Sequence, residues 1–379
     1  MKDSPILDYY RDKLDAIIES IREIVDIESP SLDVERSRAV VEFVESEARK
    51  IGSGLEIEKI AAEGYGEHLI IRAFPNAAKP VLLLGHTDTV HPIGTNLTNP
   101  TRIEGDKFYG CGIFDMKANV VVMLEALRYF AETGTRPARP INILLSCDEE
   151  VGSFTGRELV EREGSNSEYC MVLEPSAAGR VKTGRKGTSV YEIKAHGVPA
   201  HAGLEPEKGA SAILEISRQI ERISALNAPE IGTTVNVCTI KGGTTTNVIP
   251  EHAACSVDVR FSTMLEAERI DAAIRRVEPF DGRVSLEISG GINRPPMERT
   301  EAVAALFKKA HDISASFGYA LNETQVGGAS DGNFVAALGV PVLDGLGITG
   351  DGAHTLNEHI LTNDIPNRAT LITMILMEN

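Results

Sequence analysis

The chain has no tryptophan, and aromatic residues make up only 5% of its 379 positions. Cysteine is also scarce. The five cysteines lie far apart, without any Cys-x-x-Cys pair, at positions 111, 147, 170, 238 and 255. An odd, dispersed set of this kind argues against a disulfide framework and against a thiolate zinc site. We therefore expect each cysteine to be a small buried apolar side chain.

Long apolar runs are missing as well. The run at residues 120–124, one of the longest, is far shorter than the roughly 20 residues that cross a bilayer. Residues 1–5 include an aspartate and lack the apolar stretch of a secretory signal. The sequence therefore predicts a cytoplasmic protein with no membrane partner.

Basic residues are outnumbered, since 38 lysines and arginines face 55 aspartates and glutamates, for a formal charge of −17. Nucleic-acid binding needs clustered basic side chains, so this balance argues against a nucleic-acid partner. The same charge mildly repels anionic substrates, and an acidic substrate would need basic residues in its own binding site. Bound divalent cations would cancel part of the negative charge.

Apolar runs alternate with helical patterns in the first half of the chain. Apolar residues at helical spacing predict helices over 5–27, 32–50, 116–132 and 156–163. Short apolar runs between turn-forming residues predict strands over 68–72, 80–84, 141–145 and 169–173. The last three strands are mostly apolar, which is typical of strands buried on both faces of a parallel sheet. The pattern indicates an α/β fold with a mostly parallel sheet and helices on both faces.

The pattern changes near Gly184. Strands are predicted over 188–195, 234–241, 253–261 and 284–288, with helices over 209–226 and 265–276. This β-α-β-β-α-β order is that of a ferredoxin-like α+β module. A helix over 302–317 and a strand over 340–343 then resume the first pattern. We expect a discontinuous catalytic domain, 1–183 with 296–379, and an inserted lid domain, 184–295.

Candidate ligands follow the predicted parallel strands. His86 and Asp88 end the strand at 80–84, Glu149 and Glu150 follow the strand at 141–145, and Glu174 follows the strand at 169–173. Two more candidates complete the set, with Asp115 just before a predicted helix and His354 beyond the last strand. Ligands of open α/β sheets bind beyond the carboxyl ends of the strands, so these side chains are expected to meet at one edge.

Crowded carboxylates repel one another unless cations lie among them. Imidazole and carboxylate ligands suit zinc or a similar first-row ion. One aspartate shared by two ions, with a histidine and a carboxylate for each, leaves room for a bound water. His86 and Asp88 point to the same side of a strand, so Asp88 can accept the second ring N–H of His86. Of the adjacent Glu149 and Glu150, one can bind metal while its neighbour acts as general base.

These residues resemble the co-catalytic zinc peptidases and deacylases, a family that includes glutamate carboxypeptidase, aminoacylase, acetylornithine deacetylase and succinyl-diaminopimelate desuccinylase. The matching segments extend over nearly the whole chain in the family's order: 85–90, 115–117, 148–153, 173–175, 201–203 and His354. Segments 201–212 and 174–179 are most similar to glutamate carboxypeptidase. Cys111 and the pair Ala118 and Asn119 depart from the family's usual residues near Asp115.

The resemblance implies two zinc ions, with cobalt or manganese as possible substitutes. Asp115 would bridge them, and a cis peptide would follow it. His86 and Glu174 would complete one site, and Glu150 and His354 the other. Glu149 would be the general base and Asp88 the residue that orients His86.

The resemblance also gives roles to residues of the inserted domain. His201 would stabilise the oxyanion, and in dimeric members it reaches into the partner's active site, so a homodimer through the lid domain is expected. Asn247 and Arg260 would hold the substrate, and Arg294 would bind a carboxylate. Lys182, in the first segment, is a looser match for contact with an acidic substrate side chain.

The predicted function is hydrolysis of an amide or peptide bond in an N-acyl amino acid or short peptide with a free carboxylate. The nearest alternative is a deacylase of the acetylornithine or succinyl-diaminopimelate type, with the same chemistry and a different pocket. An alternative of another class is a non-catalytic binding protein on a hydrolase scaffold. A binding protein of that kind is expected to lack a metal ligand or the general base, and this sequence has all of these residues.

Overall fold

The computed structural model describes residues 4–52 and 54–378. The chain divides into two compact units. The first comprises Met1–Gly184, Arg299–Val326 and Ser330–Asn379, and the second comprises Arg185–Glu298 and Gly327–Ala329. The second unit is therefore an insertion in the first.

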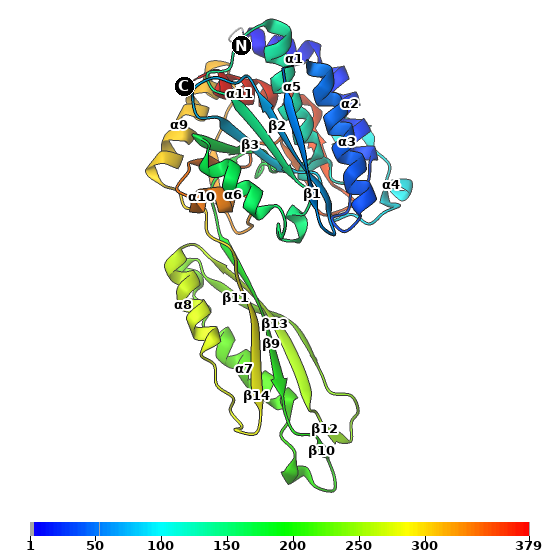
Figure 1. The fold of residues 1–379 in the computed structure, drawn as a ribbon, viewed down its shortest axis with the longest axis vertical. Coiled ribbons are helices and arrows are strands. Elements are labelled where there is room, and N and C mark those ends of the chain that lie inside the picture. The colour runs from blue at the N-terminus through cyan, green and yellow to red at the C-terminus, as the bar shows by residue number, and fades with distance from the viewer. Residues whose placement is uncertain (1–3, 53, 379) are drawn as a thin grey trace. The chain divides into compact units, whose positions relative to one another are not determined.

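A six-stranded mixed sheet forms the centre of the first unit (Figure 1). Its order is β1-β2-β6-β3-β7-β16, with the strands β1 Glu56–Ala62, β2 Gly66–Ala73, β6 Ile141–Ser146, β3 Val81–His86, β7 Tyr169–Val172 and β16 Val342–Leu343. The neighbours from β6 to β16 are parallel, whereas β1 and β2 are antiparallel to each other and β2 is antiparallel to β6. The predicted α/β fold with a mostly parallel sheet is confirmed.

Both faces of this sheet are buried. Every residue of β3 and β6 is buried, because apolar side chains point alternately to the two sides. Leu83 of β3 lies in the main apolar core. The helices that contribute to that core are α1 Pro5–Asp12, α2 Leu14–Asp26, α3 Val34–Ile51, α5 Ala118–Thr133, α9 Glu301–Ser316 and α11 Ile365–Met377. Two further helices, α6 Arg157–Ser165 and α10 Gly332–Ala337, pack on β6 and β7.

Smaller elements surround the carboxyl ends of the central strands. A four-stranded antiparallel sheet has the order β17-β18-β5-β4, with β17 Gly350–Asp351, β18 His359–Leu361, β5 Lys107–Tyr109 and β4 Arg102–Glu104. Two strands, β8 Val181–Arg185 and β15 Glu323–Val326, pair with each other. Four short helices, α4 Thr95–Thr98, η1 Ile113–Lys117, η2 Glu149–Val151 and η5 Thr362–Asp364, lie in the loops.

The second unit is an antiparallel sheet covered by helices. Its order is β11-β13-β9-β14, with β11 Thr234–Gly242, β13 His252–Phe261, β9 Gly187–His196 and β14 Ser285–Arg294. Helices α7 Ala212–Ser224 and α8 Met264–Arg275 pack against one face. A short ribbon pairs β10 Ala200–His201 with β12 Val248–Ile249, and single turns η3 Pro206–Lys208 and η4 Pro229–Ile231 join the elements. The predicted ferredoxin-like order of major elements is confirmed.

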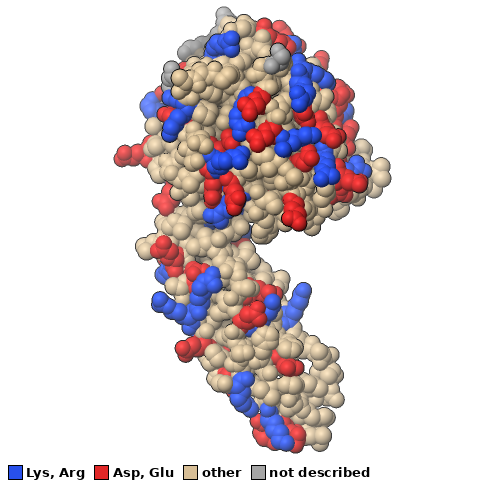
Figure 2. Space-filling view, in the orientation of Figure 1, with Lys and Arg blue, Asp and Glu red and all other residues tan. Residues whose placement is uncertain are grey.

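Some sequence expectations differ from the structure. The helix expected over 5–27 is divided at Lys13 into α1 and α2. Four cysteines are buried as expected, but Cys238 is exposed on β11. No helix among residues 4–52 and 54–378 is long and apolar enough to span a membrane. On the face drawn in Figure 2, basic side chains are interspersed with acidic ones.

Gly347 gives a test of the packing behind the carboxyl end of β7. Its N–H donates to the backbone oxygen of Glu174 at 3.0 Å, and an added Cβ would meet that oxygen at 2.7 Å and would also clash with Asn119. Asn119 is itself held, because it donates to Phe114 and accepts from Ile348. We expect Gly347→Ala to lower the free energy of unfolding by about 1–3 kcal/mol, because neither neighbour can move freely.

Urea unfolding would measure this change. Gly282→Ala is a suitable control, because a Cβ there meets no heavy atom within 4 Å. An unchanged unfolding midpoint for Gly347→Ala would contradict the tight packing of this loop.

Candidate metal centre

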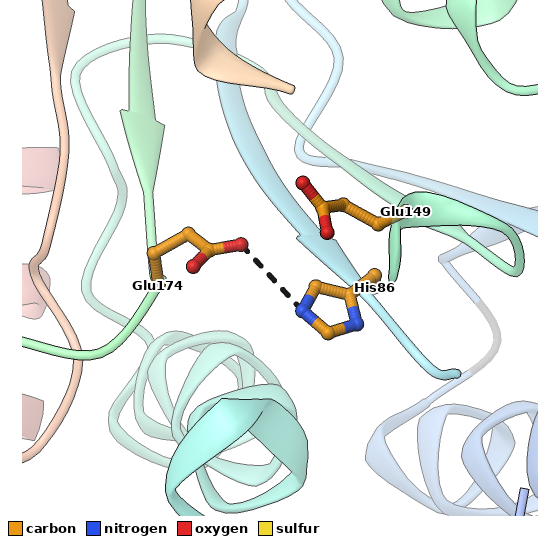
Figure 3. A group of neighbouring side chains, drawn as sticks. All are labelled: His86, Glu149 and Glu174. Atoms are coloured by element: carbon orange, nitrogen blue, oxygen red, sulfur yellow. Dashed lines mark ion pairs between the residues drawn. The ribbon is translucent and has the colours of Figure 1, made fainter. Parts of the chain in front are cut away.

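Acidic and imidazole side chains meet at the carboxyl ends of β3, β6 and β7. His86 is the last residue of β3, Glu149 and Glu150 open η2 after β6, and Glu174 follows β7 by two residues. The side chains of His86, Glu149 and Glu174 lie close together at these strand ends (Figure 3). Their position follows from parallel strands, because the residues after such strands meet at one edge.

Asp115 lies between two imidazoles. Its Oδ1 is 3.0 Å from Nε2 of His86, and its Oδ2 is 3.4 Å from Nε2 of His354. Each carboxylate oxygen therefore faces a different histidine. This is the arrangement that an aspartate shared by two cations requires.

A second carboxylate accompanies each histidine. Glu174 lies 3.5 Å from Nε2 of His86, and Glu150 lies 3.1 Å from Nε2 of His354. Ligand atoms lie within 4.8 Å of one another in two groups, His86 with Glu149 and Glu174, and His86 with Asp115 and Glu150. All five predicted metal ligands, with Glu149, are thus brought together in the first unit.

The pKa shifts of the histidines and of Asp115 indicate that positive charge is stabilised at this centre. Burial opposes protonation of His86, but hydrogen bonds to Asp115 and Asp88 outweigh it and raise the pKa of His86 well above its ordinary value. Hydrogen bonds to Asp115 and Glu150 raise the pKa of His354 to about 10. Burial opposes ionisation of Asp115, yet the two histidines lower the pKa of its carboxyl group. Without metal, protons on the imidazoles supply the charge that the carboxylates need.

Metal ions fit this set of donors. Oε1 of Glu150 is buried and has no hydrogen-bond partner among the described residues, which a metal bond would correct. Burial also raises the pKa of Glu150, so its charged form needs a cation nearby. Two imidazoles with several carboxylates suit zinc and similar first-row ions. Asp115, His86, Glu174, Glu150 and His354 are the side chains that would hold them.

Asp88 connects His86 to the loop of the two glutamates. Its carboxylate accepts the backbone N–H groups of Glu149 and Glu150 at 3.2 and 3.1 Å, and the hydroxyl of Ser31 at 2.7 Å. Nδ1 of His86 lies 2.9 Å from the backbone oxygen of Asp88 and 3.4 Å from its carboxylate. The ring is therefore oriented by the backbone carbonyl as much as by the expected carboxylate.

Glu358 holds the loop that carries Asp115. Its buried carboxylate accepts the backbone N–H groups of Gly112, Phe114 and Asp115, each at 2.9 Å. Nε2 of His91 lies 2.8 Å from the same carboxylate. The peptide bond between Asp115 and Met116, in this loop, is cis. Three backbone hydrogen bonds to one carboxylate hold the loop from which Asp115 projects.

Two residues of the loops that carry the candidate ligands also show unusual backbone angles. His354 has a φ of 64° and Ser153, just after η2, has a φ of 57°. Non-glycine residues rarely adopt this left-handed region, and such conformations persist only where surrounding contacts hold them. Ser153 is held by a hydrogen bond from its hydroxyl to buried Asp331.

The remaining predicted residues lie outside this cluster. His201, Asn247, Arg260 and Arg294 belong to the second unit. Arg260 is paired with Asp258 on its own strand, at 2.8 Å. Arg294 is buried and contacts Asn293 at 3.4 Å, while Asn247 is exposed.

Lys182 belongs to the first unit and is buried on β8. Its backbone pairs with Asp344, and its aliphatic chain lies against Gly345.

Sequence reasoning missed three residues beside the centre. Glu358 and His91 were not predicted to contribute, and Lys117 had no role beyond the motif that contains it. Lys117 is buried and donates to the backbone oxygen of Ile27, and burial lowers its pKa to about 8. Acids and lysines are common on loops. The only signals in the sequence were therefore that Lys117 is two positions after Asp115 and that Glu358 is four positions after His354.

Comparison with known proteins gives one consistent result. Residues 82–378 match the model of "Peptidase family M20/M25/M40". The chain is 30% identical to carboxypeptidase G2 of Pseudomonas sp. (strain RS-16), over 100% of this chain and 92% of the relative. It is 29% identical to succinyl-diaminopimelate desuccinylase of Verminephrobacter eiseniae (strain EF01-2), over 77% of each protein. The crystal structure of aminopeptidase PepT from Bacillus cereus ATCC 10987 matches with a TM-score of 0.81 and 22% identity, covering 96% of this chain and 98% of that one.

The contacts of Glu358 predict a loss of metal affinity when its charge is removed. In Glu358→Gln, an amide NH2 replaces one acceptor oxygen and would face backbone N–H donors. We expect zinc affinity to fall about 10- to 100-fold, as for other residues that position metal ligands. Competition with a chromogenic chelator would measure it. Glu301→Gln, at an exposed position on α9, is the control, and equal affinities for the two variants would contradict the role of Glu358.

The raised histidine pKa values predict that metal binding depends on pH. An ion binds neutral imidazole, so it must displace the proton of His354, whose pKa is about 10. Apparent zinc affinity should therefore rise about tenfold per pH unit for each displaced proton between pH 6.5 and 8.5. Calorimetry in buffers of different ionisation enthalpy would count the protons released. Affinity that does not change with pH would contradict protonated histidines in the metal-free centre.

Proposed function

The chain belongs to peptidase family M20/M25/M40, and we propose that it uses two zinc ions to hydrolyse the amide bond of an N-acyl amino acid or short peptide with a free carboxylate. The observation that carries this proposal is Asp115, whose two oxygens face His86 and His354, each with a further carboxylate beside it. Three protein ligands for each ion leave positions for water and substrate.

Bound zinc would supply an activated water and would polarise the amide carbonyl. The chain's own residues perform the proton transfer. Two ions with three protein ligands each need six ligand positions, and Asp115, counted twice, fills these with His86, Glu174, Glu150 and His354. Glu149 lies beside His86 and Glu174 and is not one of these ligands. It takes a proton from the water whose oxygen attacks the carbonyl carbon. As the carbon–nitrogen bond breaks, the same carboxyl group gives that proton to the leaving amine.

His201 suits a role in stabilising the oxyanion. Its Nδ1 accepts the backbone N–H groups of Gly203 and Leu204 at 3.1 and 3.2 Å. The ring proton of the neutral imidazole must therefore be on Nε2, which leaves Nε2 as a donor. The side chain is exposed, so this donor is free to reach a substrate oxygen.

We further propose a homodimer through the second unit. β11 and β14 are the edge strands of its sheet, and β11 is exposed from Cys238 to Gly242. An exposed edge strand offers unpaired backbone groups to another chain. In such a dimer, His201 would serve the active site of the partner subunit.

Candidate carboxylate-binding residues lie in both units. Arg294 is buried, and a buried guanidinium can hold a substrate carboxylate with two parallel bonds. Arg260 and Asn247 would contact the remainder of the substrate, and Lys182 an acidic side chain. Asp258, paired with Arg260, would keep that guanidinium in place until substrate binds.

A carboxypeptidase reaction is favoured because the carboxypeptidase G2 relative is matched over the whole of this chain. The desuccinylase relatives support a second candidate, the removal of an acyl group such as succinyl from an amino acid. Both reactions break an amide bond, so they differ in the groups that flank it.

Zinc-reconstituted protein, assayed with folyl-glutamate and acyl-glutamate against acetylornithine and succinyl-diaminopimelate, would test the proposal. We expect the glutamate amides to have the highest kcat/KM. Glu149→Gln should lower kcat about 10²- to 10⁴-fold while it retains zinc, because it cannot accept the proton. Glu158→Gln, exposed on α6, is the matched control.

Turnover of succinyl-diaminopimelate alone would favour the desuccinylase instead. Substrate binding without turnover would favour a non-catalytic binding protein. Retention of most turnover by Glu149→Gln would contradict its role as general base.

A further inference from the structure

Two histidines of the second unit face each other across neighbouring strands. His196 ends β9 and His252 begins β13, and the antiparallel register places them directly opposite each other. The alternate residues Tyr191, Ile193 and Ala195 point into the core beneath α7 and α8. His196, which is half-buried, therefore lies on the other face of the sheet, and the exposed His252 lies opposite it on that face.

The distance between their nitrogens suits a shared metal ion. Nδ1 of His196 lies 3.3 Å from Nδ1 of His252, with the rings nearly perpendicular at 79°. Two imidazole nitrogens bound to one tetrahedral ion, each at about 2.0–2.1 Å, are separated by about 3.4 Å. The backbone register thus provides two ligands at the required spacing.

Each outer nitrogen faces a carboxylate. Nε2 of His196 lies 3.6 Å from Glu287, and Nε2 of His252 lies 3.7 Å from Glu251. Carboxylates in this position favour a proton on Nε2, as they do for histidines that bind metal. With both protons on Nε2, the two Nδ1 lone pairs face each other, and a cation between them would stabilise this arrangement.

The two histidines also border open space. A cavity of about 460 Å³ is lined by both of them and by Lys194, Lys241 and Glu251. The ammonium group of Lys194 is already paired with Glu192, at 2.9 Å, so part of the nearby positive charge is compensated. The cavity leaves room for water ligands to complete the coordination of an ion.

We infer that His196 and His252 form a two-histidine binding site for a divalent first-row cation such as zinc, nickel or copper. Imidazole pairs select these ions over magnesium and calcium. The remaining ligands are water, and Glu287 and Glu251 orient the rings. With only two protein ligands, this site binds its ion more weakly than a centre with three ligands for each ion. The inference does not depend on the proposed function.

Zinc titration by calorimetry tests the site on the full chain. The protein is first loaded at its tightest sites and freed of excess metal, and zinc is then added again. We expect wild type to bind one further, weaker equivalent. His196→Asn and His252→Asn should each lower the affinity for that equivalent at least tenfold, and Glu287→Gln about tenfold.

Two control variants distinguish loss of the weak site from the general effect of replacing a histidine and from loss of zinc at the Asp115 centre. His311→Asn, on α9, should leave the weak equivalent unchanged, as should Asp115→Asn, which removes only tight binding. Copper bound at the weak site should give an electron paramagnetic resonance spectrum with coupling to two imidazole nitrogens. The site is overturned if both histidine variants retain the weak equivalent, or if copper shows coupling to one nitrogen in folded wild type.

Discussion

The first unit depends on one electrostatic constraint, which is the sharing of the Asp115 carboxylate between two imidazoles. The surrounding carboxylates would repel one another if they were charged without a cation between them. The raised pKa values of His86 and His354 show how the metal-free protein meets this demand, with protons in the places where metal ions would lie. Without cations the carboxylates of this set would repel one another, and bound cations would remove that repulsion.

The fold satisfies this constraint mainly through backbone contacts. Parallel strands bring His86, Glu150 and Glu174 to one edge, but Asp115 comes from a loop that no strand fixes. Glu358 holds this loop instead, because its carboxylate accepts hydrogen bonds from three backbone N–H groups. Asp88 does the same for the glutamate loop. Buried carboxylates that accept backbone N–H groups therefore position those that face the metal site.

The sequence predicted the central strands well, because short, mostly apolar runs between turn-forming residues have few alternatives to a buried strand. It missed β1, whose polar residues such as Glu56 and Lys59 belong to an edge strand. It also missed α11, which is buried on most of its sides and so lacks the one-sided apolar pattern of a surface helix. His86, Glu149 and Glu174 could be found from strand ends alone. Asp115 and His354 were candidates from a predicted helix start and from the chain beyond the last strand, but their places in the two metal sites came from the resemblance to a family. Glu358 gave almost no signal, because three of its partners are backbone N–H groups.

The choice of substrate must be made away from the metal ligands. Carboxypeptidases and desuccinylases both hydrolyse an amide, so the imidazoles, carboxylates and general base that we propose would serve either reaction. Discrimination therefore needs side chains that meet the groups flanking the bond, and a site built to pair a carboxylate rejects a substrate that leaves its guanidinium unpaired. Arg294, which we propose to bind a substrate carboxylate, is buried in the inserted unit. Contact with the flanking groups is the physical reason to look for specificity in the inserted unit and not among the candidate metal ligands at the strand ends.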